Sequence, residues 1–371
     1  MEGTFEGVLV CNNGSVYIGP QGVLITDLRN CDIVIVEGTV KGNIQGKHII
    51  MRGDATVEGS VTGDSVEMGP NVELHGQMTV THKTKRQSST SPTKREPHLK
   101  TNLLLLDPQT DFHDEGAMAV PDASDDSKRC AKFIRNNKDS IDEIFVSMDS
   151  HHRMHIAHGV FWIDESGESP PPYTVILNEH IEAGKWRPRD DAPDILEYVK
   201  YYTKELEARG KVKLTIWPEH CLIGSPGHSV VPVINDALQE WATGNLNTVT
   251  YIMKGTNCLT EMYSALSAEV EIASDPSTHL DAGMVERLTS GDRLLVCGQS
   301  LSHTVAFTVR DIVRHADSAQ AARVVVLEDG CSALPGYDGM AREFIKEMKE
   351  MGIQVCNFSD VKMSSSTSDT L

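Results

Sequence analysis

The hydrophobic pattern changes twice along the chain and divides it into three segments. Up to about residue 80, short alternating β-type runs are punctuated by glycine. Residues 82–100, HKTKRQSSTSPTKREPHLK, contain six Lys or Arg, one acid and almost no apolar residues. From Thr101 onward, apolar strands alternate with amphipathic helices. We therefore expect domains at 1–82 and 101–361, a basic disordered linker at 83–100 and a disordered tail at 362–371.

The first segment repeats with a period of 17 residues, as the phrases VEGTVKGNI and VEGSVTGDS illustrate. Three columns of similar residues align at this period: Val23, Val40, Val57 and Leu74; Gly42, Gly59 and Gly76; and Ile44, Val61 and Met78. A short fixed period is typical of a solenoid, in which each rung buries its inward side chains against its neighbours. The pattern predicts a right-handed β-helix solenoid with aliphatic columns as its core and glycines at tight corners.

This repeat resembles the bactofilins, a family of polymer-forming β-helical proteins, over residues 5–80. The phrases EGTVKGNI and EGSVTGDS carry the resemblance. It implies a homo-oligomer that assembles through the β-helix, associated with a cytoskeletal or polymeric structure. An uncapped solenoid end also presents an unpaired strand edge on which another copy can stack. A monomeric β-helix capped by its flanking segments is the alternative.

The third segment alternates strands with helices. The expected strands are NLLLLD, EIFVSMD, VKLTIWP, TVTYIMKG, DRLLVCG and ARVVVLED. The expected helices are SKRCAKFIRNNKDSI, PDILEYVKYYTKELEARG, VVPVINDALQEWATG, LTEMYSALSAEVEIA and YDGMAREFIKEMKEMG. This alternation predicts a three-layer α/β fold with a parallel sheet flanked by helices. Ligands of such sheets bind beyond the carboxyl ends of the strands.

Polar residues collect at those strand ends. Asp107 ends the first strand, where a carboxylate can act as a general base or cap a helix. Asp149 and His151 end the second, and His220 ends the third, so the three can form a facial metal triad. Lys254 ends the fourth strand, where it can stabilise negative charge or form a salt bridge. Spacing alone does not fix the ligands, because the same loop also contains His152, His155 and His158.

The fifth strand ends in VCG and is followed by QSLSHTVAFTVRDIV, with a helix expected to start near Thr304. A helix N-terminus lowers the pKa of a thiol and donates N–H groups to an oxyanion. It is therefore a favourable position for a nucleophile.

These phrases resemble the nicotinamidases, within the isochorismatase-like cysteine hydrolases, over nearly all of residues 101–361. The matching phrases are DPQTDFHDEGAMAVP, SMDSHHRMH, WPEHCLIGSPG, IMKG with EMYSAL, and GQSLSHTVAFTVRDI. The resemblance implies Asp107 and Lys254 as catalytic residues and position 304 as the nucleophile. It implies Asp149, His151 and His220 as ligands of one divalent metal ion, zinc foremost, with iron or manganese as alternatives. It implies substrate contacts by Phe112, Ser302 and His303.

The chain departs from the family at Thr304, where the family has cysteine. The flanking residues fit without a gap, so the departure is a local replacement. A threonine hydroxyl is far less acidic than a thiol, whose pKa is about 8.5, and needs a stronger base to attack an amide. Cys297 and Cys258 are weak candidates for a substitute nucleophile, and Cys221 is expected to be structural. Water activated by the metal, or acid catalysis by the Asp as in isochorismate-cleaving relatives that lack this metal set, would bypass the nucleophile.

Composition narrows the remaining choices. The net charge of −19 argues against nucleic acid as a partner. No apolar run approaches the roughly 18 residues of a membrane span. The N-terminus has no signal-peptide pattern, and the eight cysteines form no CxxC pair, so we expect a cytoplasmic protein with reduced thiols.

Two functions are consistent with these features. The first is a nicotinamidase-like amide hydrolase that converts nicotinamide, or another small amide, to the acid and ammonia in pyridine nucleotide salvage. The second is a metal-binding pseudoenzyme that acts as a scaffold or cytoskeletal assembly protein.

Overall fold

The computed structural model describes residues 3–6, 9–10, 15–69, 71–80, 99–210 and 212–363. The chain divides into two compact units, residues 1–94 and 95–371. The expected linker and tail lie outside the described residues, except at 99–100 and 362–363.

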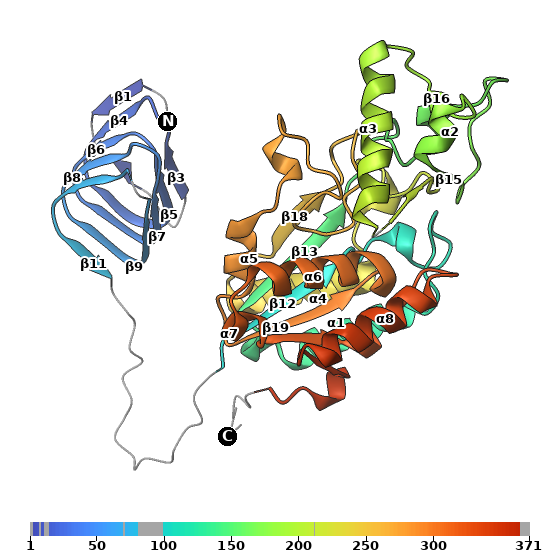
Figure 1. The fold of residues 1–371 in the computed structure, drawn as a ribbon. Helices are drawn as coiled ribbons and strands as arrows, with labels where there is room; N and C mark the ends of the chain where they lie inside the picture. Colours follow the sequence, from blue (N-terminus) through green and yellow to red (C-terminus); the bar gives the residue numbers. More distant parts are fainter. Residues whose placement is uncertain are drawn as a thin grey trace. The chain divides into compact units, whose positions relative to one another are not determined.

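The first unit consists of two parallel β-sheets (Figure 1). One sheet has the order β1 (Gly3–Glu6), β4 (Gly22–Ile25), β6 (Thr39–Lys41), β8 (Thr56–Glu58) and β10 (Glu73–His75). The other has the order β11 (Met78–Val80), β9 (Val61–Met68), β7 (Ile44–Met51), β5 (Leu28–Val36) and β2 (Leu9–Val10), and β3 (Ser15–Ile18) also pairs with β5. The bactofilin-like repeat thus forms stacked parallel strands whose apolar side chains make one core.

The 17-residue period appears as the register between neighbouring strands. Val57 pairs with both Val40 and Leu74, and Val61 pairs with both Ile44 and Met78. The first column needs one correction, because Val40 pairs with Leu24 and not with Val23. Leu24 is fully buried while Val23 is half-buried. The spacing between β4 and β6 is one residue shorter than the repeat, which moves the neighbouring aliphatic residue into the core.

The glycine column is explained by the close approach of successive 17-residue repeats. A Cβ at Gly59 would overlap the carbonyl oxygen of Gly42, and a Cβ at Gly76 would overlap that of Gly59. Gly59 also has a φ of +155°. Glycine is therefore required here both by the backbone angle and by the approach of the previous rung.

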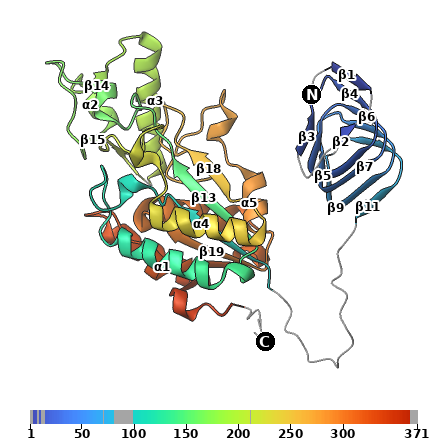
Figure 2. The ribbon, with the colours of Figure 1, turned by 180° about the vertical axis from the view of Figure 1, so that it is seen from behind.

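The second unit contains a six-stranded parallel sheet. Its order is β18 (Thr250–Lys254), β13 (Glu143–Asp149), β12 (Thr101–Leu106), β19 (Arg293–Gly298), β20 (Val324–Leu327) and β21 (Gln354–Cys356). Helices α1 (Ala123–Asn136) and α4 (Pro232–Asn245) cover one face (Figure 2). Helices α5 (Ala282–Leu288) and α6 (Ala306–His315) cover the opposite face (Figure 1). The predicted parallel sheet flanked by helices is therefore confirmed.

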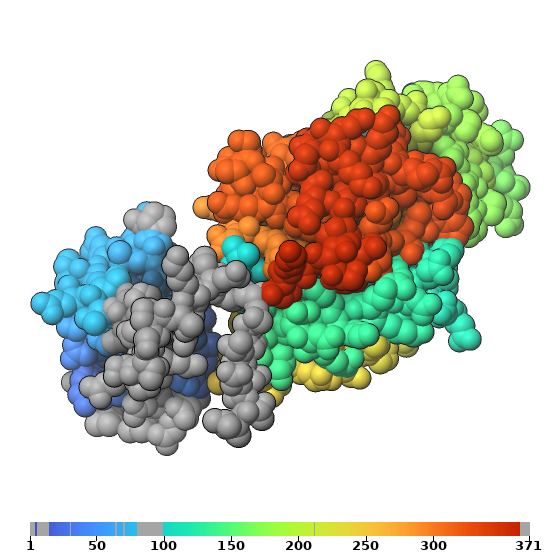
Figure 3. Space-filling view, turned by 90° about the horizontal axis from the view of Figure 1, so that it is seen from below, coloured from blue at the N-terminus to red at the C-terminus, as the bar shows by residue number. Residues whose placement is uncertain are grey.

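Helix α8 (Asp338–Glu350) lies beside α6, and the guanidinium of Arg310 forms an ion pair with Glu347 at 2.7 Å. The residues after α8, red in Figure 3, lie next to the green segment that contains α1. The rings of Phe133 and Phe358 make this contact, with centroids 5.0 Å apart. The remaining elements are α2 (Asn178–Glu182), α3 (Pro193–Arg209), α7 (Ser318–Ala321), β14 (Trp162–Ile163), β15 (Val175–Ile176), β16 (Arg187–Pro188) and β17 (Leu214–Thr215). Among the described residues, no helix combines the length and apolar character that a bilayer crossing requires.

Two expected elements of this unit are wrong. The segment VKLTIWP does not join the parallel sheet, since its short strand β17 pairs antiparallel with β15. The sheet's sixth strand is β21 instead. The side chains of Leu214, Ile216 and Trp217 are nevertheless buried, so their apolar pattern reflects burial rather than membership of the sheet.

The segment LTEMYSALSAEVEIA, residues 259–273, is irregular rather than helical. Side chains form hydrogen bonds with its backbone groups: Thr260 Oγ1 donates to the Val270 carbonyl at 2.8 Å, and the Ala265 N–H donates to Thr308 Oγ1 at 2.9 Å. Tertiary contacts therefore override the helical spacing of its apolar residues.

Candidate active site

Asp107 directly follows β12 and adopts a φ of +43°, which is rare for a residue other than glycine. Ser147 holds this conformation. Its hydroxyl accepts a hydrogen bond from the Asp107 N–H at 3.0 Å and donates one to Asp107 Oδ1. The fully buried carboxylate therefore has a fixed orientation at the carboxyl edge of the sheet.

The structure brings the three expected catalytic positions together around one oxygen atom. Asp107 Oδ2 accepts a hydrogen bond from Thr304 Oγ1 at 2.9 Å and lies 3.1 Å from Lys254 Nζ. Lys254 Nζ also lies 2.8 Å from Asp149 Oδ1 and donates to the Met262 carbonyl at 3.1 Å. One ammonium group therefore connects the expected catalytic carboxylate to the expected metal-binding carboxylate.

Burial and charge act in opposite directions on this network. Burial raises the pKa of Asp107 more than Lys254 lowers it, which makes this carboxylate a stronger base than an ordinary Asp. Burial would lower the pKa of Lys254, but the two carboxylates outweigh it and raise the pKa. Burial would likewise raise the pKa of Asp149, but His151 and Lys254 hold it well below its usual range. Asp149 is therefore charged at neutral pH, as a metal ligand should be.

The expected metal ligands Asp149, His151 and His220 are all buried and face one another. Asp149 Oδ1 lies 3.1 Å from His151 Nε2, and Asp149 Oδ2 lies 3.2 Å from His220 Nε2. Two ligand atoms bound to one zinc ion at ordinary angles are about 3.0–3.4 Å apart. His220 Nδ1 donates to the Pro218 carbonyl at 2.8 Å, which leaves the lone pair on Nε2 free. The donor set and its spacing therefore fit a divalent ion.

Two further residues shape the surroundings of these expected ligands: Gln109 holds the backbone of Asp149, and Gly255 leaves space beside the side chains. The Gln109 amide donates to the Asp149 carbonyl and accepts from the Asp149 N–H, both at 2.7 Å. Gly255 follows Lys254 with a φ of +73°. A Cβ there would lie 3.0 Å from both Asp149 Oδ1 and His151 Cε1, so glycine leaves room for the metal ligands.

The remaining histidines of the loop separate into two kinds. His152 is exposed, whereas His155 and His158 are fully buried next to His151. Burial lowers the pKa of His155 well below its usual value and that of His158 to about 3, so both rings are neutral at pH 7. Two groups of three residues thus bring possible ligand atoms within 4.8 Å of one another, one around Asp149 and one made of His151, His155 and His158.

The segment that carries Thr304 links β19 to α6. It contains a cis peptide between Gln299 and Ser300 and a π-helical turn over Leu301–Val305 (η6). Ser302 Oγ lies 3.0 Å from His303 Nδ1 and accepts from the Leu334 N–H at 3.3 Å. Ser302 is not among the described residues that line the pocket, whereas the other two expected substrate contacts, Phe112 and His303, line it.

The pocket at this site has a volume of only about 30 Å³. A single water molecule needs about 10–15 Å³, and typical ligand sites have about 300–1,000 Å³. A pyridine ring therefore requires the pocket to widen. Sequence reasoning missed half of the residues that line it: Met118, Trp217, Glu261, Met262, Tyr263, Ser300 and Leu334.

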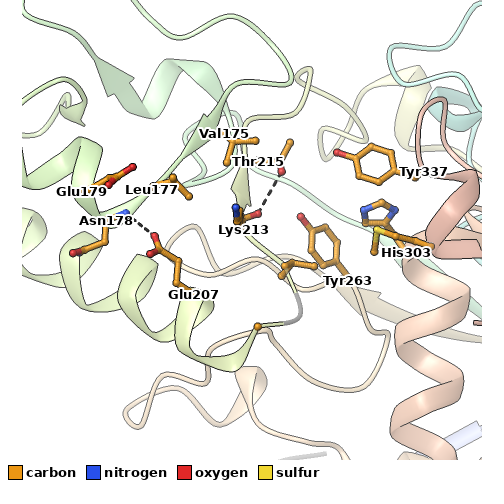
Figure 4. A pocket seen from close by; sticks show the side chains of 13 residues that line it. Val175, Leu177, Asn178, Glu179, Glu207, Lys213, Thr215, Tyr263, His303 and Tyr337 are labelled. Atoms are coloured by element: carbon orange, nitrogen blue, oxygen red, sulfur yellow. Dashed lines mark hydrogen bonds between the residues drawn. The ribbon is translucent and has the colours of Figure 1, made fainter. Parts of the chain in front are cut away.

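A larger cavity of about 660 Å³ adjoins this pocket and shares Tyr263 and His303 with it (Figure 4). The His303 ring lies 5.1 Å from the Tyr263 ring and 4.7 Å from the Tyr337 ring. We call these three residues, Tyr263, His303 and Tyr337, the aromatic wall. The opposite end of the cavity carries Asn178 and Glu207, which are hydrogen-bonded to each other. The aromatic wall thus lies between the small candidate pocket and an outer cavity large enough for a ligand.

Glu261 is a further buried carboxyl group of the pocket. It is 4% exposed, and its Oε2 has no hydrogen-bond partner among the residues that the structure describes. Burial raises its pKa. The sequence offered one signal for Glu261, namely its position seven residues after Lys254. The helix expected over 259–273, however, gave no reason to place the Glu261 side chain in the pocket.

No cysteine is among the described residues that line the pocket. Cys297 Sγ lies 3.8 Å from Cys130 Sγ in the core, and Cys258 lies outside the lining. Burial raises the pKa of Cys221 well above its usual value, as expected for a structural thiol. Among the described residues, Thr304 therefore stands at the expected nucleophile position with no thiol beside it in the pocket.

The aromatic wall provides a pH-dependent stability prediction. Burial, and then Lys254, lower the pKa of His303 to about 4. Between pH 7 and pH 5 the unfolded chain therefore takes up a proton at this residue while the folded chain does not, so stability falls as the pH falls. This residue lowers the free energy of unfolding of the wild type by about 2 kcal/mol between pH 7 and pH 5. We therefore expect the free energy of unfolding of His303→Gln to fall by about 2 kcal/mol less than that of the wild type over the same pH range.

Tryptophan fluorescence can follow this unfolding, because all four tryptophans belong to the second unit: Trp162, Trp186, Trp217 and Trp241. Urea unfolding would be compared at pH 7 and pH 5. His152→Gln is the matched control at an exposed position and should behave as the wild type. Equal pH dependence of wild type and His303→Gln would contradict the prediction.

Comparison with known proteins gives a different result for each unit. Residues 1–79 match the family model of the bactofilins, which are described as polymer-forming cytoskeletal. No curated protein matches the chain.

Several solved structures are similar to the chain. The nicotinamidase/pyrazinamidase of Acinetobacter baumanii is 20% identical, with 71% of this chain and 99% of that chain covered and a TM-score of 0.48. The yeast nicotinamidase bound to the inhibitor nicotinaldehyde is 18% identical, with coverage of 69% and 99% and a TM-score of 0.48. The pyrazinamidase of Pyrococcus horikoshii in complex with zinc is 19% identical, with coverage of 70% and 99% and a TM-score of 0.42. Residues 1–79 are therefore a bactofilin domain, and nicotinamidases and pyrazinamidases are among the solved structures that the chain resembles.

Proposed function

We propose that the second unit is a metal-dependent amide hydrolase of the nicotinamidase type whose rate is limited by the hydroxyl nucleophile Thr304. The observation that carries this proposal is the hydrogen bond from Thr304 Oγ1 to Asp107 Oδ2, 2.9 Å long, beside the Asp149, His151 and His220 group. Thr304 and the metal-binding group line one pocket, and the buried Asp107 contacts two of its lining residues, Thr304 and Lys254. The substrate is nicotinamide or another small aromatic amide, and the products are the acid and ammonia.

Each residue has a role that follows from its contacts. Asp107 accepts the Thr304 proton as the hydroxyl attacks the amide carbonyl, and its raised pKa favours this transfer. Lys254 stabilises the charge of both carboxylates while the proton moves. A divalent ion held by Asp149, His151 and His220 would supply a Lewis acid that orients the ring nitrogen of the substrate. The proton on Asp107 then passes to the leaving amine, which departs as ammonia and leaves an ester on Thr304 Oγ1. A water molecule, deprotonated by Asp107, cleaves this ester, so that the acid is released and the Thr304 hydroxyl is restored.

The proposal also requires a route into the pocket. The outer cavity of about 660 Å³ adjoins the catalytic pocket of about 30 Å³ only across the residues of the aromatic wall that both share. We therefore place substrate entry at Tyr263 and His303, whose rings must move apart to admit an aromatic amide.

A pseudoenzyme is the second candidate function, and the same threonine favours it. A threonine hydroxyl is a weak nucleophile, and its β-methyl occupies space in a pocket that is already small. In this alternative the unit retains the metal and binds a small amide without hydrolysing it. Ammonia release and amide binding, measured on the same zinc-loaded protein, separate the two functions: binding without release supports the pseudoenzyme.

We expect the full chain to bind one divalent ion and Asp149→Ala to bind none. Asp149 is the carboxylate of the group, with one oxygen beside each of the two histidines. Bound zinc per chain would be measured by elemental analysis after dialysis. His152→Ala, at an exposed position on the same loop, should retain one ion. Equal zinc content in Asp149→Ala and wild type would contradict the assignment.

For the first unit we propose a right-handed β-helix that assembles into polymers through its ends. Among the described residues, β11 is the last strand and leaves part of the core column uncovered: Met78 is 40% exposed, whereas Val61 and Ile44, stacked behind it, are at most 1% exposed. Apolar side chains at an open strand edge favour stacking of a second copy.

We expect Met78→Glu to reduce assembly, because it places a charge on the apolar end. Analytical ultracentrifugation should show large species for the wild type and much smaller ones for the variant. Thr79→Glu adds the same charge on the same strand but on its opposite side, and should assemble as the wild type does. A wild type that sediments as a monomer at high concentration would rule out this assembly.

A further inference from the structure

Three buried ring nitrogens beside the metal group lack a hydrogen-bond partner among the described residues. They are His151 Nδ1, His155 Nε2 and His158 Nε2, on side chains that are at most 2% exposed. One ring nitrogen of each histidine lies within 4.8 Å of one ring nitrogen of each of the other two. Buried polar atoms in folded proteins are almost always bonded, so this histidine cluster indicates that something binds between the rings.

The contacts of His155 and His158 determine which nitrogen of each ring carries the proton. His158 Nδ1 lies 3.1 Å from the Arg153 carbonyl and must donate to it, which leaves a lone pair on Nε2. The Ala157 N–H donates to His155 Nδ1 at 3.1 Å, which places the proton of that ring on Nε2. His158 therefore offers an acceptor to the cluster, and His155 offers a donor.

The position of the proton on the third ring, His151, depends on the proposed metal site. The inference therefore rests on the proposed function. When His151 binds a metal ion through Nε2, the proton of its neutral ring is on Nδ1. The histidine cluster then contains two N–H donors, on His151 and His155, and one acceptor, on His158.

This combination matches a water molecule and does not match a second metal ion. A metal ion needs a lone pair from each ligand, and His155 Nε2 has none to give. One water molecule can accept from two N–H groups and donate to one lone pair. Three nitrogens hydrogen-bonded to one water oxygen lie about 4.6 Å apart, a spacing that the grouping of the three rings within 4.8 Å accommodates.

We propose that His155 and His158, through one buried water molecule, form the outer shell of the metal ligand His151. The water accepts the His151 Nδ1 proton and is itself held by the other two rings. This arrangement fixes the tautomer and the orientation of His151, as a carboxylate or carbonyl does in other metal sites. His155 and His158 are thus positioning residues, and their loss should weaken metal binding by about 10–100-fold.

The test is the zinc dissociation constant of the full chain, measured by competition with a chelator. His158→Leu removes the acceptor and should weaken zinc binding by about 10–100-fold, while the bound amount at saturation stays at one ion per chain. His158→Gln provides a new acceptor oxygen and should recover part of the affinity. His152→Leu is the matched control on the same loop and should bind as the wild type does. The visible spectrum of the cobalt-loaded protein should change in His158→Leu and not in His152→Leu.

Other results would overturn the inference. Two zinc ions per wild-type chain, with one lost in His158→Leu, would make the histidine cluster a second metal site. Equal zinc affinity in the wild type, His158→Leu and His158→Gln would exclude an outer-shell role. A wild type that binds no zinc would overturn this inference together with the metal site itself. If the metal site holds but no amide is hydrolysed, only the catalytic part of the proposed function fails.

Discussion

Thr304→Cys should raise the rate of nicotinamide hydrolysis by the zinc-loaded chain by at least about 10³-fold. The substitution places a thiol 2.9 Å or slightly more from a base that burial has already strengthened. It also removes a branched methyl group from a pocket of about 30 Å³. The measurement is ammonia release at a series of nicotinamide concentrations, which gives kcat and KM separately.

Three companion variants identify the cause of the gain. Thr304→Ser keeps a hydroxyl but removes the methyl group, so a large gain in this variant would assign the effect to space rather than to nucleophilicity. Thr304→Ala should remove whatever activity the wild type has. If that activity persists in Thr304→Ala but not in Asp107→Ala, the reaction does not use residue 304 as a nucleophile. Cys297→Ser should change nothing, since its thiol lies in the core beside Cys130.

Lys254→Met should destabilise the metal-free second unit by about 3–5 kcal/mol. Lys254 is 2% exposed and lies within 3.1 Å of two buried carboxylates, Asp107 and Asp149. Removing the ammonium group leaves both without their main cation, which is costly even if Asp107 takes up a proton. Urea unfolding followed by tryptophan fluorescence, in the presence of a chelator, would give the difference in free energy.

Two further variants test whether the loss of stability comes from the buried charges. Lys128→Met removes a lysine whose ion pair with Asp125 is exposed to solvent, and it should leave stability unchanged. Adding Asp107→Asn to Lys254→Met should recover part of the loss, because one buried charge disappears with its partner. Similar stability of Lys254→Met and Lys128→Met would mean that the buried network contributes little.

The arrangement of the candidate site is largely predictable because parallel strands end at one edge of a sheet. Asp107, Asp149 and Lys254 each end a strand that is recognisable from its apolar run, and the structure places the three next to one another. The histidines of the loop show where this reasoning stops. Spacing offers four imidazoles in this loop, and only the packing of the loop shows that His152 is exposed while His155 and His158 are buried.

The parts that could not be predicted depend on contacts between distant segments. The spacing of apolar residues in 259–273 favours a helix, yet the segment is irregular because side chains such as Thr260 and Thr308 bond its backbone. The same contacts direct Glu261 and Tyr263 into the pocket. Likewise, the one-residue change in spacing that places Leu24 rather than Val23 in the core becomes visible only in the strand register.

The stacked glycines of the first unit determine how its length can change. Gly59 and Gly76 each lie against the carbonyl oxygen of the glycine 17 residues earlier, so an insertion between these positions has to keep that spacing. Duplicating residues 43–59 would add one complete rung with a glycine at the required corner. A duplication one residue shorter would put a side chain against the preceding carbonyl oxygen and turn the apolar columns outward. The part of the unit between Gly42 and Gly76 can therefore grow or shrink only in steps of 17 residues.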